Sequence, residues 1–260
     1  MEQLLLVTLV TGFTGGCLLW LLSRVVRKYC IIDAFWGPGF AVLAGVAAFR
    51  VNQHMLTPAE QLLLLATCIW ALRLGVYLAI RILRDPHEDR RYAAMAEKYG
   101  PSFRWTSLGI VFLLQALIMW FVALPVTIGC SGIFADGAKS WLLPGGLLWA
   151  TGLFFETVGD WQLARFRSRP DSSGKVLDTG LWRLTRHPNY FGDFCVWWGL
   201  WMLSQAAGAP LWTIISPAAM AFFLLRVSGV TLLEKDIAER RPEYVDYIRR
   251  TNAFFPGRPR

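Results

Sequence analysis

The sequence predicts an all-α integral membrane protein with seven transmembrane helices. First, 55% of the 260 residues are hydrophobic and the mean hydropathy is +0.42, whereas a soluble domain usually has about 45–50% apolar residues. Second, the apolar residues fall into blocks close to the roughly 20 residues that cross a bilayer. Third, basic residues gather in alternate connections, which predicts an N-terminus outside and a C-terminus in the cytoplasm.

Seven apolar blocks are expected to form the transmembrane helices. In chain order they cover residues 4–22, 31–49, 60–80, 106–128, 141–164, 189–207 and 211–230. The second and third blocks carry the weakest signal, because Asp33, Arg73 and Arg81 interrupt them or lie at their ends. No linker divides the chain, so we expect one membrane domain over residues 1–260.

Within this domain we expect a three-helix part at 1–105 and a four-helix part with a cytoplasmic tail at 106–260. The first block lacks the basic start and the cleavage site of a signal peptide. Its basic residues follow it, which places residues 24–28 and the later basic loops on the cytoplasmic side of the membrane. This topology accounts for the net charge of +8, so the bilayer is the expected partner and nucleic acid is not.

Polar side chains accumulate at the predicted cytoplasmic ends of the spans. Lipid anchoring explains basic residues there, but not the acidic and amide groups of Asp33, Glu156, Asp160, Asn189 and Asp193. Charged groups close to hydrocarbon are costly and usually mark a site. We therefore expect a mixed-sign cavity that opens to the cytoplasm and binds a soluble cofactor; helix caps and salt-bridged helix ends are the alternative.

The densest polar segment is residues 180–192, between two apolar spans. Its Arg183, Arg186, His187 and Asn189 are expected to receive an anionic group such as the phosphates of a nucleotide, because arginine presents a planar fork of donors. A basic loop held against lipid headgroups is the other interpretation. The cysteines and histidines are dispersed without metal-ligand spacing, so no metal site is predicted.

Two further regions extend this hypothesis. Arg73 and Tyr77 lie one helical turn apart on one face of the third span, too deep for Arg73 to be only interfacial. The tail that ends at residues 243–250 has the pattern of an amphipathic helix. Such a helix either attaches to anionic lipid or closes over a bound nucleotide.

Residues 155–256 resemble the C-terminal domain of the steroid 5α-reductase family, in particular a bacterial branch long catalogued as a domain of unknown function. The resemblance rests on Asp160-Trp161-Gln162, on residues 180–193, and on residues 247–256. It implies a membrane reductase that uses NADPH to reduce a carbon–carbon double bond conjugated to a ketone. The implied substrate is a 3-oxo-Δ4 steroid or a similar apolar enone that enters from the membrane.

The motifs and the resemblance together predict the site residues. Asp33 and Tyr77 are the expected catalytic pair that polarises the ketone, since Trp70 stands where the family has a tyrosine. Lys175 stands where the family has an arginine, which keeps the charge but loses the bidentate geometry. The expected cofactor-binding residues are Arg73, Glu156, Asp160, Arg167, Lys175, Arg183, Arg186, His187, Asn189, Asp193, Trp197, Tyr247 and Arg250.

The main alternative is a membrane methyltransferase that uses S-adenosylmethionine, of the isoprenylcysteine or phospholipid type. Those enzymes share the Arg-His-Pro-x-Tyr-x-Gly pattern of residues 186–192. They usually carry a Glu-Glu pair near the end of the last span, where this chain has Glu234-Lys235. A non-enzymatic scaffold or transporter is a third alternative, and it leaves the polar cluster unexplained.

Overall fold

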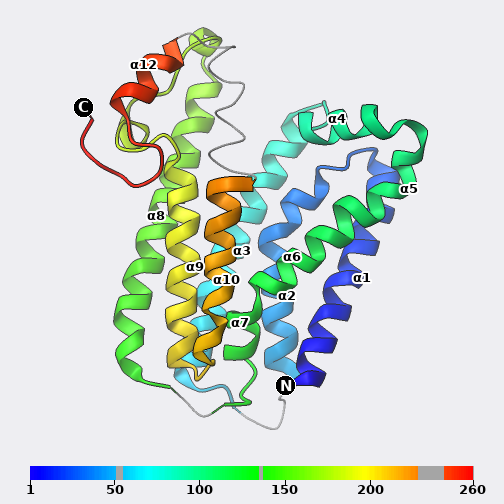
Figure 1. Cartoon of the computed structure of the whole chain (residues 1–260), viewed down its shortest axis with the longest axis vertical. Helices are drawn as coiled ribbons and strands as arrows, with labels where there is room; N and C mark the ends of the chain where they lie inside the picture. Colours follow the sequence, from blue (N-terminus) through cyan, green and yellow to red (C-terminus); the bar gives the residue numbers. More distant parts are fainter. Residues whose placement is uncertain (51–54, 135–136, 228–242, 260) are drawn as a thin grey trace. The chain divides into compact units, whose positions relative to one another are not determined.

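The computed structural model describes residues 1–50, 55–134, 137–227 and 243–259, and their regular structure is helical throughout (Figure 1). The all-α prediction is therefore confirmed. The chain divides into two compact units. Unit 1 comprises Met1–Lys139 and Leu203–Ser216, and unit 2 comprises Ser140–Met202 and Pro217–Arg260.

Five helical stretches within the described residues are long and apolar enough to cross a membrane. They are Glu2–Val26, Ile31–Phe49, Pro58–Arg84, Arg90–Val122 and Lys139–Arg167. These stretches include most of the first five predicted spans, and they make this a membrane protein by length and composition. The sixth predicted span forms α9 (Pro188–Ala206), and the seventh overlaps a shorter apolar helix, Leu211–Arg226. Seven crossings and their orientation remain predictions.

Three long helices open unit 1: α1 (Glu2–Val26), α2 (Ile31–Arg50) and α3 (Pro58–Arg84). A capping box starts α3, because Thr57 Oγ1 accepts from the Glu60 amide at 3.4 Å and the Thr57 amide donates to Glu60 Oε2 at 2.7 Å. Small residues bring α2 and α3 into backbone contact. A Cβ added at Gly37 would lie 2.3 Å from the carbonyl oxygen of Ala71.

The rest of unit 1 begins with α4 (Arg90–Tyr99), which runs across the long helices in Figure 1. The predicted span 106–128 is not one regular helix. It comprises α5 (Phe103–Ser107), a π-helical stretch (Leu108–Leu113), α6 (Leu114–Val122) and α7 (Leu124–Gly129). Pro125 lies in the first turn of α7, where its missing N–H costs no helical hydrogen bond, and this explains the break at Ala123.

Unit 2 is built on α8 (Leu142–Arg167) and the part of α9 up to Met202, with α12 (Glu243–Arg250) in its tail. Glycines recur every seven residues on both long helices, at 145, 152 and 159 on α8 and at 192 and 199 on α9. A Cβ added at Gly192 would lie 2.5 Å from the Glu156 amide nitrogen, and one at Gly199 would lie 2.5 Å from that of Trp149. The two backbones therefore touch along the glycine faces.

Short helical segments complete the described chain. They are α10 (Ile215–Phe222), the π-helical turn Phe223–Val227, and the 3-10 turns Gly100–Ser102, Lys139–Trp141, Pro170–Ser172, Gly180–Arg183 and Leu211–Ile214. The turn Gly180–Arg183 lies against the cytoplasmic end predicted for α8, since Gln162 Oε1 accepts from the Leu181 amide at 3.0 Å. This contact places the polar segment 180–192 beside Asp160.

Candidate functional site

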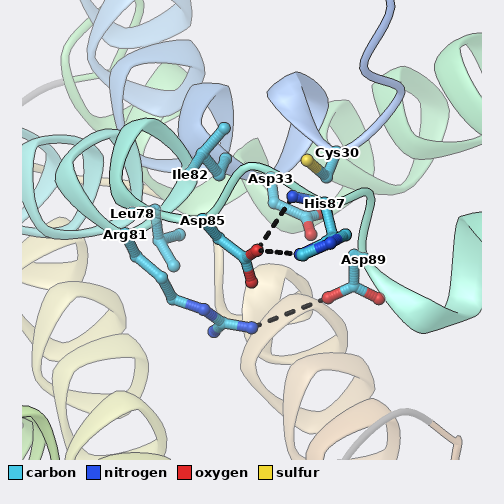
Figure 2. A pocket seen from close by; sticks show the side chains of 8 residues that line it. All are labelled: Cys30, Asp33, Leu78, Arg81, Ile82, Asp85, His87 and Asp89. Carbon is cyan, nitrogen blue, oxygen red and sulfur yellow. Dashed lines mark hydrogen bonds and ion pairs between the residues drawn. The ribbon is translucent and has the colours of Figure 1, made fainter.

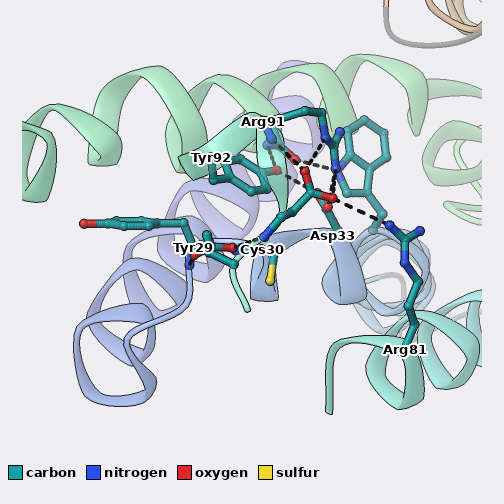
Figure 3. A network of polar contacts seen from close by, with 10 residues as sticks. Tyr29, Cys30, Asp33, Arg81, Arg91 and Tyr92 are labelled. Atoms are coloured by element: carbon teal, nitrogen blue, oxygen red, sulfur yellow. Dashed lines mark hydrogen bonds and ion pairs between the residues drawn. The ribbon is translucent and has the colours of Figure 1, made fainter. Parts of the chain in front are cut away.

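In unit 1, Asp33 is the centre of a network that joins residues far apart in the sequence (Figure 3). It lies in the first turn of α2. Its Oδ1 accepts from the Tyr92 hydroxyl at 2.7 Å, and its Oδ2 accepts from Arg91 Nη2 at 2.6 Å. The side chain of Asp33 is 20% exposed and that of Arg91 is 51% exposed. The network is thus open to solvent on its arginine side.

The network extends in both directions from Asp33. Toward the core, Gln115 Nε2 donates to the Tyr92 hydroxyl at 3.0 Å, and Trp36 Nε1 donates to Gln115 Oε1 at 2.7 Å. Toward the surface, Arg91 Nε donates to Asp89 Oδ1 at 3.0 Å, while Arg81 Nη2 lies 3.6 Å from Asp89 Oδ2. Four helices, α2, α3, α4 and α6, are linked by these side chains.

The connection between α3 and α4 also holds the turn between α1 and α2. The Glu88 carboxylate accepts from the backbone amides of Tyr29 and Cys30, the latter at 3.1 Å. Lys28 Nζ donates to the carbonyl oxygens of Ile82, at 3.0 Å, and Asp85. These four bonds satisfy backbone groups at or next to helix ends, which otherwise lack partners.

Two groups in these connections have displaced pKa values. Burial, followed by the hydrogen bond and negative charge of Glu88, raises the pKa of the Cys30 thiol to about 12. Burial also acts to raise the pKa of Asp89, but hydrogen bonds from the Arg91 side chain and amide, with the charges of Arg91 and Arg81, lower it below its ordinary value. At neutral pH, Cys30 is a thiol and Asp89 a carboxylate.

A pocket of about 40 Å³ lies beside Asp33 in unit 1 (Figure 2). Its lining is Cys30, Asp33, Leu78, Arg81, Ile82, Asp85, His87 and Asp89. Ligand pockets for drug-sized molecules usually exceed about 300 Å³, so this pocket has room for a few waters and not for a steroid.

The two residues of the predicted catalytic pair contact different side chains. Asp33 has Tyr92 as its phenolic partner, a contact that the sequence did not predict. Tyr77 instead lies beneath Arg73, whose guanidinium carbon is 5.5 Å from the ring centroid, as the one-turn spacing predicted. Trp70 is buried in the core, with its ring centroid 5.6 Å from that of Phe40. The catalytic roles of Asp33 and Tyr77 stay predictions.

Unit 2 brings most of the predicted cofactor residues together around the end of α8 and the start of α9. Asp160 is buried, and its Oδ1 accepts from Asn189 Nδ2 at 3.1 Å. Glu156 is buried one turn earlier on α8. His187 is also buried, and its ring stacks on Tyr190 with centroids 5.7 Å apart.

Arg186 has a structural contact that the sequence did not predict. Its guanidinium donates to the carbonyl oxygens of Ile248, at 3.2 Å, and Thr251, and its amide donates to that of Asn252 at 2.9 Å. Neighbouring groups continue this attachment, since Thr185 Oγ1 donates to the carbonyl of Phe254 at 2.8 Å. Arg186 therefore fastens the C-terminal tail, and its role toward a cofactor remains a prediction.

Tyr247 is buried on α12, and its hydroxyl donates to the carbonyl of Trp182. Asp193 follows Asn189 by one turn of α9, and Trp197 is fully buried one turn further. The remaining predicted cofactor residues of unit 2 are exposed cations. They are Arg167, Arg183, Lys175, which pairs with Asp171 at 2.9 Å, and Arg250, which pairs with Asp178 at 2.7 Å.

The division into two units separates the predicted site residues. Asp33, Arg73 and Tyr77 belong to unit 1, and the other predicted residues belong to unit 2. Among the described residues, no group of three or more His, Cys, Asp or Glu side chains could hold a metal ion. Glu234 and Lys235, which bear on the methyltransferase alternative, lie outside the described residues.

Comparison with known proteins gives one curated relative and one family. The nickel-cobalt-cadmium resistance protein NccN of Alcaligenes xylosoxydans xylosoxydans is 31% identical over 105 residues, which cover 40% of this chain and 46% of the relative. The match thus spans less than half the length of that relative. No solved structure matches the chain. A model of the family described as a protein of unknown function, DUF1295, matches residues 19–251, and the chain belongs to this family.

Proposed function

We propose that this protein is an integral membrane reductase that uses NADPH to reduce the carbon–carbon double bond of an apolar enone such as a 3-oxo-Δ4 steroid. The observation that carries the proposal is the cluster in unit 2, where buried Asp160 bonds to Asn189 beside buried Glu156. Burying a carboxylate and an amide at a helix end costs free energy, and attachment to lipid does not require it. A binding site for a polar cofactor does require such groups.

The side chains of unit 2 fit the chemistry of NADPH. Carboxylate and amide groups such as those of Asp160 and Asn189 suit ribose hydroxyls and carboxamides. The exposed cations Arg167, Lys175 and Arg183 suit phosphate oxygens, and a 2′-phosphate adds negative charge that NADH lacks. We propose that this cluster faces the cytoplasm of a bacterium, where the cofactor is present.

When bound, NADPH would supply a hydride to the β-carbon of the enone. A hydrogen-bond donor close to the ketone stabilises the negative charge that develops on its oxygen. The sequence predicts Asp33 and Tyr77 for this role; of the two, Tyr77 carries a hydroxyl that can donate, whereas Asp33 accepts from Tyr92 and Arg91. A proton from water completes the reduction at the α-carbon. The apolar faces of the membrane helices provide entry for a substrate from the bilayer.

The test is a thermal-shift comparison of purified protein with NADPH, NADH and S-adenosylmethionine at equal concentration. A ligand that binds only the folded form stabilises it by RT ln(1 + [L]/Kd), so the tightest ligand raises the melting temperature most. We expect NADPH to give the largest shift, and Asp160→Asn to reduce this shift while Asp171→Asn leaves most of it. A shift with none of the three from folded protein would refute a nucleotide site.

The methyltransferase remains a second candidate because residues 186–192 carry the shared pattern exactly where α9 begins beside Asp160. A shift with S-adenosylmethionine alone, together with methyl transfer to a lipid, would select it. The relative NccN is named for resistance to nickel, cobalt and cadmium, so we add these three ions as further ligands in the same thermal-shift measurement.

A further inference from the structure

Unit 1 carries an aromatic platform at the end where α1, α4 and α5 meet. It consists of Trp20, Tyr29, Tyr99, Phe103 and Trp105. The ring centroids of Trp20 and Trp105 are 5.6 Å apart, those of Tyr29 and Phe103 are 4.7 Å apart, and those of Tyr99 and Phe103 are 6.2 Å apart. Trp20 Nε1 donates to the carbonyl of Arg104 at 3.2 Å, which fixes the start of α5 against α1.

Three cations from three helices rest on this platform. The Arg104 guanidinium carbon lies 5.1 Å from the ring centroid of Trp105, and Lys98 Nζ lies 5.5 Å from that of Tyr99. Arg24 Nη1 donates to the Tyr29 hydroxyl at 3.1 Å. All three side chains are exposed, so each presents its charge outward from an aromatic surface.

These three cations differ in their partners from Arg81 and Arg91, which lie at the same end of unit 1. Arg81 and Arg91 pair with the carboxylates of Asp89 and Asp33. Within the described part of the chain, no carboxylate forms an ion pair with Arg24, Lys98 or Arg104. The platform thus holds positive charge with which no carboxylate of the described residues forms an ion pair.

We propose that this platform binds the headgroup of an anionic phospholipid. Tryptophan and tyrosine favour the level of the headgroups in a bilayer, and basic residues at that level attract anionic lipids. The phosphodiester supplies the negative charge and hydrogen-bond acceptors that the three cations lack. The helix α4 lies across the long helices (Figure 1) with Tyr92 buried beneath it, as expected of a helix in the interfacial plane.

The experiment measures lipid retained by the purified protein in native mass spectrometry, with phosphatidylglycerol or phosphatidylcholine added at equal concentration. We expect the wild type to retain phosphatidylglycerol in preference. The variant Lys98→Gln with Arg104→Gln should lose about tenfold in phosphatidylglycerol affinity, because two interfacial charges are removed. The variant Arg84→Gln with Arg90→Gln removes the same charge from exposed positions of the same end of unit 1, away from the platform, and should change affinity less than threefold.

Two outcomes would overturn the proposal. One is equal retention of the two lipids by the wild type, and the other is an equal loss in both double variants, which would mean a diffuse effect of surface charge. A third variant, Trp105→Leu, keeps every charge and tests the rings, so phosphatidylglycerol affinity should fall severalfold. Melting temperatures in phosphatidylcholine, matched across the variants, establish that each one is folded.

Discussion

The two units of this protein hold their polar residues in different ways. In unit 1, Asp33, Asp89, Arg81 and Arg91 are joined side chain to side chain, with opposite charges in contact. In unit 2, Arg186 donates instead to backbone carbonyls of the tail, and Asp160 accepts from the neutral amide of Asn189. We place cofactor binding in unit 2 because the buried carboxylate of Asp160 and the amide of Asn189 lie together there, at the end of one helix and the start of the next.

The largest effect is expected at Arg186. Replacement by methionine removes hydrogen bonds from a charged donor to the carbonyls of Ile248 and Thr251, each worth about 1.5–3 kcal/mol. We expect the tail from residue 243 onward to be cleaved rapidly in limited proteolysis and the melting temperature to fall. Arg183→Met is the matched control, since Arg183 is exposed three residues earlier and should change stability by less than about 0.5 kcal/mol. An equally protected tail in both variants would contradict the attachment.

A smaller effect is expected in the network of unit 1. Asp33→Asn keeps the shape of the side chain but removes the charge that faces Arg91, and Tyr92→Phe removes the hydroxyl donor. We expect each substitution to cost about 1–2 kcal/mol, less than a fully buried pair because the Arg91 side chain is 51% exposed. A double-mutant cycle measures their coupling. Additive costs would show that Tyr92 and Asp33 do not act on each other.

The pH dependence of unit 1 gives a smaller effect again. The pKa of Asp89 is lowered in the folded protein, so this carboxylate stabilises the fold above its unfolded pKa of about 4. That contribution is lost as the pH falls through the folded value. The melting-temperature difference between wild type and Asp89→Asn should therefore shrink between about pH 6 and pH 3. A melting-temperature difference that is constant across this pH range would show that the protonation of Asp89 is not coupled to folding.

The smallest effect on stability is expected at Lys175. Its pair with Asp171 joins exposed side chains four residues apart, and solvent and salt screen such pairs, so they contribute little to stability. Lys175→Gln should therefore leave the melting temperature almost unchanged. Under the proposed function, Lys175→Gln should nevertheless reduce the difference between the melting-temperature shifts that NADPH and NADH produce. This result would distinguish a cation that binds ligand from one that stabilises the fold, such as Arg186.

The sequence predicted the helices better than the contacts between them. Apolar block length predicted α8 and α9 to within a few residues, and the spacing of Arg73 and Tyr77 predicted their contact, since both depend on neighbours along one helix. It did not predict the partner of Asp33, because Tyr92 is 59 residues away and no local pattern relates them. The contact of Arg186 with the tail was not predicted either, because residue type alone does not tell whether a guanidinium donates to a phosphate or to peptide carbonyls.

The sequence also joined α5, the π-helical stretch, α6 and α7 into one span. Hydropathy averages over a window, and it does not register that Pro125 favours a new helix start. The capping box of Thr57 and Glu60 could have been recognised from the Thr-x-x-Glu pattern. It places the start of α3 at Pro58, two residues before the apolar block at 60–80. Local capping signals thus locate helix boundaries more precisely than hydropathy does.

The glycine faces of α8 and α9 carry a consequence for tolerance to mutation. The bond between Asp160 and Asn189 joins two helices whose backbones touch at Gly152 and Gly192, where a side chain would not fit. A single methyl group at either position would push α8 and α9 apart and move the Asp160 carboxylate out of line with the Asn189 amide. Two positions that carry no chemistry of their own would then be sensitive to replacement.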